Sequence, residues 1–169
     1  ASHEAMLDSG LDINNIDSHR FGVIVSSGIG GLGSIEKNYQ TGEKRGFDRV
    51  SPFFIPMTIS NLAAGHIAIA YHAQGLCTCP VTACAGGTNA IGDAFRNIRD
   101  GYQDVMIAGG CEASVTPLGI GGFTSMKALS DATDPDRASI PFDKERNGFV
   151  MGEGAGILIL EELEHAFKR

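Results

Sequence analysis

The chain has 169 residues, 43% of them hydrophobic and 20% charged, a balance typical of a soluble globular protein of about one domain's length. Its net charge of -7 argues against a general nucleic-acid binder, and no apolar run approaches the roughly 20 residues of a membrane-spanning helix. The first residues show neither a signal pattern nor an initiating Met, so the chain is expected to begin inside a longer protein.

The first half of the chain predicts helices and a strand joined by glycine and proline turns. Residues 21–27 are almost all apolar, which favours a buried strand. The expected elements, in chain order, are a helix over 1–9 ended by Gly10, a polar loop over 11–20, the strand over 21–27, a glycine-rich turn over 28–33 leading into a helix through Glu36 and Tyr39, a polar and mainly basic loop over 41–49, an extended segment over 51–56 and a helix over 57–73.

The second half alternates strands and helices in the same way. The expected elements are a strand over 76–81, a helix over 85–100 stopped by Gly101, a strand over 104–109, a partly helical stretch over 116–129, a polar loop over 130–146, a hairpin of 149–151 and 156–160, and a helix over 161–169. This order predicts an α/β fold. Its mainly parallel sheet should be covered by helices on both faces, with the antiparallel hairpin at one side.

Four cysteines are present, and their spacing matches neither a zinc site nor a disulfide framework. Free thiols in a reducing cytosol are therefore expected, which favours a cytoplasmic protein without a bound metal. The cysteines are Cys77, Cys79, Cys84 and Cys111.

Cys84 follows a predicted strand and directly precedes a predicted helix. Unpaired N–H groups at a helix start carry partial positive charge and stabilise a thiolate, the nucleophilic form of cysteine. Gly86 and Gly87, in the first turn, would let another backbone or a substrate approach closely. The plainer interpretation is a small buried apolar residue, and no histidine pairs with Cys84 by its sequence position. Both interpretations stay open on these residues.

The pattern Gly28-x-Gly30-x-x-Gly33 follows a strand and precedes a helix, as a dinucleotide-binding fingerprint does. That fingerprint also needs a second strand ending in an acidic residue about 20 positions further on. Here that region contains two prolines and no run of strand-forming residues. A turn that simply requires glycine is therefore favoured over nucleotide binding.

Three longer blocks closely resemble the elongating condensing enzymes of bacterial fatty-acid synthesis, the beta-ketoacyl-[acyl-carrier-protein] synthase II family, and the likeness extends along nearly the whole chain. The blocks are Val81-Thr-Ala-Cys84-Ala-Gly-Gly; Gly109-Gly-Cys-Glu112 through Pro117-Leu-Gly-Ile-Gly-Gly-Phe123; and Pro141-Phe-Asp-Lys-Glu-Arg146-Asn-Gly-Phe-Val-Met-Gly-Glu153-Gly-Ala-Gly156. The segment Ser51–Pro56 also resembles the family.

The resemblance implies a thiolase-like fold, in which a mixed, mainly parallel sheet lies between helix layers. It implies that Cys84 accepts the acyl group as a thioester, and that Phe54 reaches across a dimer. Residues 1–169 would form most of one half only, part of the N-terminal half, with no second domain present. The positions that it implies for the acyl pocket are Gly28, Ile29, Phe54, Gly119 and Phe123.

The family's two catalytic histidines and a nearby lysine belong to its C-terminal half, and nothing here corresponds to them. The family's opening strand is missing as well. A catalytically inert dimerising fragment is therefore one alternative for this chain, which by itself is expected not to condense acyl and malonyl thioesters. A polyketide-type ketosynthase is the other alternative. Cys84, where related chain-length-factor subunits have Gln, and the following Ala85-Gly86-Gly87 favour the fatty-acid enzymes.

The implied partner is acyl carrier protein, which presents acyl and malonyl groups on its phosphopantetheine arm. Lys127 and Arg49 fall where the resembling enzymes carry basic docking residues. The resemblance also implies a homodimer in which the strand over 76–81 pairs antiparallel with its copy, and this strand has few charges to discourage edge pairing. No cofactor, nucleic-acid partner or membrane partner is implied.

Overall fold

The computed structural model describes every residue from 1 to 169, and the chain divides into two compact units. The first unit comprises Ala1–Gly30, Ile55–Glu112 and Gly154–Arg169. The second unit comprises Gly31–Phe54 and Ala113–Glu153. None of the helices combines the length and the apolar character that crossing a membrane would require.

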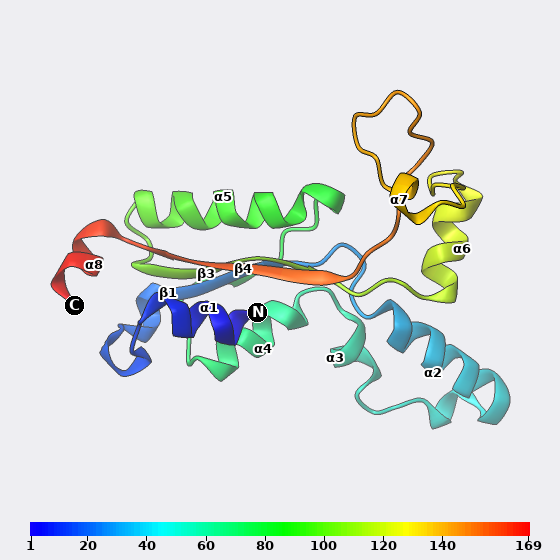
Figure 1. Cartoon of the computed structure of the whole chain (residues 1–169). Helices are drawn as coiled ribbons and strands as arrows, with labels where there is room; N and C mark the ends of the chain where they lie inside the picture. Colours follow the sequence, from blue (N-terminus) through cyan, green and yellow to red (C-terminus); the bar gives the residue numbers. More distant parts are fainter. The chain divides into compact units, whose positions relative to one another are not determined.

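A four-stranded sheet forms the centre of the first unit (Figure 1). Its strands lie in the order β2-β1-β3-β4. β1 pairs in parallel with β2 and with β3, whereas β4 runs antiparallel to β3 along its whole length. The three parallel strands therefore end at the same edge of the sheet. The strands are β1 (Phe21–Ser26), β2 (Cys77–Thr78), β3 (Val105–Glu112) and β4 (Gly154–Glu161).

Helices cover both faces of this sheet, as parallel strands require. Figure 1 shows α5 on one face and α1 and α4 on the opposite face. The mixed, mainly parallel sheet between helix layers that the sequence predicts is thereby confirmed. The helices of the first unit are α1 (Ser2–Ser9), α4 (Leu62–Ala70), α5 (Gly86–Arg99) and α8 (Leu163–Lys168), together with most of α3 (Phe54–Thr58).

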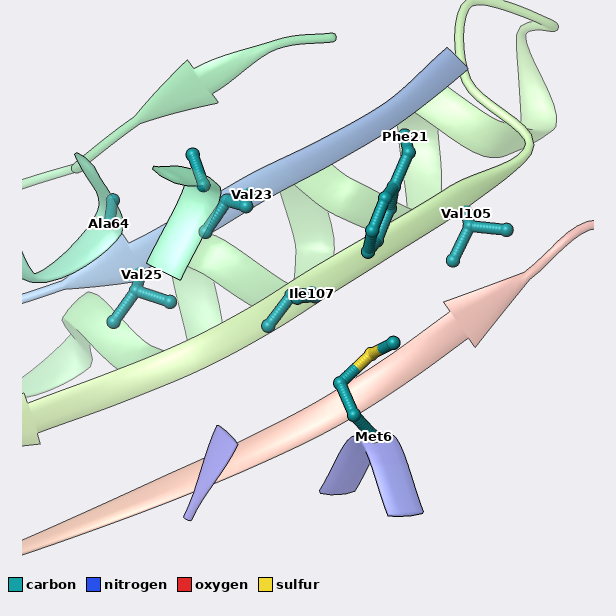
Figure 2. Packing of buried hydrophobic residues seen from close by; sticks show 8 residues of the cluster. Met6, Phe21, Val23, Val25, Ala64, Val105 and Ile107 are labelled. Carbon is teal, nitrogen blue, oxygen red and sulfur yellow. The ribbon is translucent and has the colours of Figure 1, made fainter. Parts of the chain in front are cut away.

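Two buried clusters, one on each face of the sheet, make the core of the first unit. Every residue of β1 is buried, which explains why its sequence shows no alternation of polar and apolar residues. Figure 2 shows side chains of β1 and β3 packed beside Met6 of α1 and Ala64 of α4. The cluster on that face contains Met6, Phe21, Val23, Val25, Ala64, Ala68, Val105 and Ile107, and the cluster beneath α5 contains Ile24, Ala90, Ala94, Met106 and Ala108.

The second unit is built from α2 (Leu32–Arg45), α6 (Pro117–Ser125) and the short α7 (Pro135–Ala138). The start of α6 is capped twice. Thr116 Oγ1 accepts the Gly119 N–H at 3.1 Å, and the Glu36 carboxylate of α2 accepts the Leu118 N–H at 2.5 Å. Pro117 occupies the first turn, where its missing N–H costs nothing. These contacts fix α6 against α2.

The hairpin predicted from residues 149–151 and 156–160 is wrong. Phe149 forms only an isolated bridge with Leu129, and the apolar strand β4 pairs with β3 instead. Pairing with β3 along all of β4, together with the packing of Ile157, Ile159 and Leu160 against the core clusters, outweighs the short glycine connection between the two segments. The antiparallel strand at one side of the sheet is nevertheless confirmed.

Three other predicted boundaries are also corrected. The single helix expected over 57–73 is two helices. α3 begins at Phe54, inside the segment expected to be extended, and residues 59–61 separate it from α4, where Ser60 and Asn61 favour helix ends over helix interiors. α2 extends to Arg45, into the predicted loop, and its last-turn basic residues suit the negative end of the helix dipole. β2 is only Cys77–Thr78, because Pro80 cannot donate to the ladder.

Candidate active site

Cys84 lies beyond β2, at the edge of the sheet where the parallel strands end. In open α/β sheets this edge is where ligands bind. Two hydrogen bonds hold the segment before Cys84 against the end of β1. Ser26 Oγ donates to the Pro80 carbonyl at 2.7 Å, and the Ser27 N–H donates to Cys79 Sγ at 3.4 Å.

The backbone around Cys84 makes a sharp turn between strand and helix. Ala83, Cys84 and Ala85 form one turn of 3-10 helix, and α5 begins at Gly86. Ala83 has φ 49°, a left-handed conformation that costs a non-glycine residue about 1–3 kcal/mol. The Cys84 residue is exposed, and its N–H donates to no other group of the chain. An exposed thiol and a free backbone donor are thus presented together.

Gly86 and Gly87 let the start of α5 lie directly on the sheet. A Cβ on Gly86 would lie 2.0 Å from Ser26 Oγ, and a Cβ on Gly87 would lie 3.7 Å from the Gly110 nitrogen of β3. The contact is tighter at Gly110, where a Cβ would lie 3.1 Å from the Gly87 Cα. The close approach expected at these glycines is therefore made, at least in part, by the chain's own strands.

The turn after β1 is held by Glu112, the last residue of β3. One carboxylate oxygen accepts the N–H groups of Gly28 at 2.8 Å and Ile29 at 3.1 Å. The other oxygen accepts the Ser27 hydroxyl at 3.2 Å. Ser27 Oγ in turn accepts the Gly30 N–H at 3.0 Å, so the side chains of Glu112 and Ser27 together bind the backbone of the turn.

This arrangement explains why the Gly28–Gly33 pattern is not a dinucleotide site. A pyrophosphate would need the backbone N–H groups of this turn, and an internal carboxylate already occupies two of them. Gly30 has φ 72°, and a Cβ there would lie 2.2 Å from the Thr58 carbonyl oxygen of α3. The glycines serve a tight turn packed against α3.

Of the five residues predicted to line the acyl pocket, Gly28 and Ile29 belong to the turn that Glu112 holds, in the first unit. The other three lie in the second unit. Gly119 is buried in α6, where a Cβ would lie 2.1 Å from the Ser114 carbonyl oxygen. Phe123 is half-buried and packs edge-to-face on Phe149, with ring centroids 5.3 Å apart. Phe54 begins α3 and is half-buried.

The two predicted docking residues are exposed cations of the second unit. Lys127 follows the end of α6 in a left-handed conformation, with φ 55°. Its N–H donates to the Thr124 carbonyl at 2.9 Å, and the Ala128 N–H donates to the Phe123 carbonyl at 3.1 Å, which completes a Schellman cap. Arg49 contacts the neighbouring Asp48 at 3.3 Å. Because both side chains of this ion pair are exposed, the Arg49 guanidinium remains accessible to a binding partner.

Glu112, Ser26 and Ser27 are functional candidates that the sequence reasoning did not single out. Each lies at or just beyond the carboxyl end of a parallel strand, where parallel topology gathers side chains from distant segments. An acidic residue three positions beyond the predicted strand over 104–109 is the signal that could have drawn attention to Glu112. No cluster of three or more His, Cys, Asp or Glu side chains is arranged to hold a metal ion.

Cys84 is expected to be the first thiol modified by sub-stoichiometric iodoacetamide near pH 7.5. Partial burial of the sulfur raises the pKa of the Cys111 thiol and, although the Cys77 residue is largely exposed, that of the Cys77 thiol; the Glu112 charge adds to the rise at Cys111. A raised pKa keeps a thiol protonated to higher pH, so alkylation of these two should begin only as the pH increases. Peptide mapping over pH 7 to about 10 measures the order, and labelling of Cys77, Cys79 or Cys111 before Cys84 would contradict it.

The chain matches the family model described as beta-ketoacyl synthase, N-terminal domain, over residues 1–166. The 3-oxoacyl-[acyl-carrier-protein] synthase 2 of Synechocystis sp. is 53% identical over 170 residues, covering 100% of this chain and 41% of that protein. The protein of the same name from Coxiella burnetii is 50% identical, with the same coverage. The chain therefore spans about two fifths of the length of these curated relatives.

Solved structures of similar architecture are ketosynthases. One is a type II polyketide synthase acyl-carrier protein in complex with its ketosynthase bound to the hexaketide, with TM-score 0.93 and 36% identity over 99% of this chain and 43% of that chain. Another is a beta-ketoacyl synthase from Burkholderia phymatum, with TM-score 0.84 and 31% identity over 99% of this chain and 41% of that chain.

Proposed function

The chain belongs to the beta-ketoacyl synthase family, and from this we propose that it carries the acyl-accepting thiol of a condensing enzyme of fatty-acid elongation. The proposed reaction joins an acyl group to the two carbons that remain when a malonyl thioester loses CO₂. The polypeptide of the relatives' length that contains this chain is called the full-length enzyme below. Residues 1–169 would form most of its N-terminal half.

In the first step Cys84 takes the acyl group from its carrier. The thiolate attacks the thioester carbonyl carbon, a new C–S bond forms, and the carbonyl electron pair moves to oxygen. The free Cys84 N–H is one donor that can stabilise this oxyanion. When the carbonyl re-forms, the bond to the carrier sulfur breaks, and that sulfur leaves as a thiolate and is protonated.

In the second step the acyl group leaves Cys84 for a carbon nucleophile. Loss of CO₂ from the malonyl thioester leaves an electron pair on its α-carbon, and this carbon attacks the acyl carbonyl. The new C–C bond forms as the C–S bond to Cys84 breaks, which returns the thiolate. No residue of this chain is assigned to the decarboxylation. Thioester activation supplies the driving force, so the proposal requires no cofactor beyond the carrier's arm.

The observation that carries this proposal is the exposed Cys84 on a strained strand-to-helix turn, in a chain of this family. Incubation of the full-length enzyme with an octanoyl-loaded acyl carrier protein should add the mass of one octanoyl group. Proteolytic mapping should place that group on Cys84. Acylation of Cys77 instead, or of no cysteine, would overturn the proposal.

A polyketide-type ketosynthase is the second candidate, favoured by the TM-score of 0.93 to a polyketide ketosynthase complex. The two candidates differ in the chain that they extend. A fatty-acid enzyme should extend a saturated acyl-Cys84 faster than a 3-oxoacyl one, and the reverse preference would support the polyketide activity. The identities of 53% and 50% to the two 3-oxoacyl-[acyl-carrier-protein] synthases, against 36%, favour the first.

Lys127 is proposed to bind the acidic acyl carrier protein, with Arg49 as a second docking cation. Both side chains are exposed, and rim charges act mainly on association rate. Lys127→Glu in the full-length enzyme should slow acylation by the carrier-bound substrate roughly threefold to tenfold, while acylation by a small thioester stays nearly unchanged. Rates at two salt concentrations measure the electrostatic part.

Two further variants separate docking from folding at this position. Lys127→Gly removes the charge and also the left-handed strain, so it should slow carrier-dependent acylation while stabilising the protein slightly. Lys168→Glu makes the same charge change on exposed α8 and should alter neither rate. Equal loss with both substrates in Lys127→Glu would show that this residue supports the fold or the pocket instead.

The edge strand β2 is proposed to pair with its copy in a homodimer, and the protein is proposed to act in the cytoplasm. β2 lies at the border of the sheet, and its residues Cys77 and Thr78 are exposed and uncharged. Edges of this kind are open to pairing with another strand. A monomeric mass by light scattering at micromolar concentration would count against the dimer.

A further inference from the structure

The Glu112 carboxylate is the single group that ties the Gly28–Gly30 turn to the sheet from β3. It receives two backbone N–H groups on one oxygen and a hydroxyl on the other. Hydrogen bonds to an ionised carboxylate are about twice as strong as neutral ones. A Cβ on Gly28 would lie 3.0 Å from the Glu112 oxygen, so a side chain there would make this contact tight.

Ser27 completes the arrangement from inside the turn. It is 6% exposed, and its hydroxyl links the Glu112 carboxylate to the Gly30 N–H. Three consecutive backbone N–H groups, those of residues 28–30, are therefore held directly by Glu112 or through Ser27. The Ile29 side chain, 39% exposed, projects from the middle of this held segment.

We propose that Glu112 is a positioning residue that fixes Ile29 and thereby sets how well long acyl chains are accepted at Cys84. This inference rests on the proposed function, and on the expectation from the family resemblance that Ile29 lines the acyl pocket. If the turn that carries Ile29 is already ordered, binding of a long acyl chain includes no free-energy cost for ordering it. Without the carboxylate, an acyl chain long enough to contact Ile29 must order the turn when it binds, and its binding free energy is reduced accordingly. A short acyl chain does not contact Ile29 and is not affected.

Three substitutions at Glu112 separate its geometry from its charge. Glu112→Gln can retain the contacts, because its amide oxygen can accept both N–H groups and its NH₂ can donate to Ser27 Oγ. Glu112→Ala removes them all, and Glu112→Asp is one methylene too short to reach. Ser27→Ala is a milder variant that breaks only the hydroxyl links. Glu162→Ala, which removes a carboxylate that accepts the His165 N–H at 2.7 Å at the start of α8, is the matched control.

The test measures two quantities in the full-length enzyme. The first is amide hydrogen exchange in a peptide that contains residues 28–30. The second is the ratio of Cys84 acylation rates with decanoyl and butyryl thioesters of N-acetylcysteamine. In Glu112→Ala, exchange should accelerate and the decanoyl-to-butyryl ratio should fall about tenfold, the factor expected for ordering about one residue. Ser27→Ala should shift both in the same direction by less.

Glu112→Gln should stay within about twofold of the wild type in both measurements, and so should Glu162→Ala. Cys84 alkylation by iodoacetamide should be unchanged in every variant. Unchanged exchange in Glu112→Ala, or accelerated exchange with an unchanged ratio, would overturn the proposal. A wild-type enzyme that accepts neither thioester and no carrier-bound acyl group would instead refute the proposed function, with the exchange result still reporting on the turn.

Discussion

Cys84→Ala in the full-length enzyme is expected to lower kcat/KM for condensation by at least about a thousandfold. The substitution removes the only proposed acyl acceptor, and with it the covalent intermediate that divides the reaction into two steps. Cys84 is exposed on its turn, so the loss of one sulfur atom should leave stability within about 0.5 kcal/mol of the wild type. Product formation from octanoyl and malonyl carrier proteins measures the effect.

Cys77→Ala is the matched control for this experiment. Cys77 is also an exposed cysteine of the first unit, but it lies on the edge strand β2, away from the start of α5. It should retain the wild-type condensation rate within about twofold. Substantial 3-oxoacyl product from Cys84→Ala, or a comparable loss in Cys77→Ala, would show that another group accepts the acyl chain.

Gly86→Ala is expected to lower the free energy of unfolding by about 2 kcal/mol, the cost of overpacking a well-packed site. The new Cβ would lie 2.0 Å from Ser26 Oγ and 3.0 Å from Ser26 Cβ. Ser26 is 3% exposed and donates to the Pro80 carbonyl, so it has little freedom to move away. Urea denaturation measures the loss of unfolding free energy, and the dependence of that free energy on urea concentration should be the same as in the wild type.

Gly92→Ala, in the same helix, should have the opposite effect. Nothing lies within 4 Å of a Cβ at Gly92, so replacement should stabilise the protein by about 0.5–1 kcal/mol through helix propensity alone. A double variant Gly86→Ala/Ser26→Ala should recover part of the loss, because the nearest clashing atom is then absent. Equal effects at Gly86 and Gly92 would show that the sheet does not restrict α5 here.

The sequence is a sufficient guide to the elements that depend on local rules. The unbroken apolar run of β1 and the 3.6-residue spacing of α5 predict those elements closely, and Gly10 and Gly101 end their helices in left-handed conformations as expected. Parallel topology follows from the alternation of strands and helices. Hydrophobic periodicity and glycine stops act over a few residues, so they can be read without the rest of the chain.

Local sequence patterns do not predict which distant segments pair with each other. β4 has a plausible neighbour in Phe149–Met151, yet it pairs with β3, because only the assembled sheet offers a buried apolar partner of matching length. The same limit applies to the break between α3 and α4. There the Gly30 turn approaches the Thr58 carbonyl so closely that only glycine fits, a contact between segments that are far apart in sequence.

At the candidate site, the residue types and their order along the chain determine the family and indicate the proposed nucleophile: Cys84 before a glycine pair, within a chain that matches the beta-ketoacyl synthase N-terminal domain. Tertiary structure decides what surrounds that cysteine. Gly86 is small because Ser26 lies beneath it, and the Gly28–Gly30 turn is ordered because β3 brings the Glu112 carboxylate to the end of β1. The first contact depends on the packing of α5 against β1, and the second depends on the parallel pairing of β1 and β3; no local pattern encodes either.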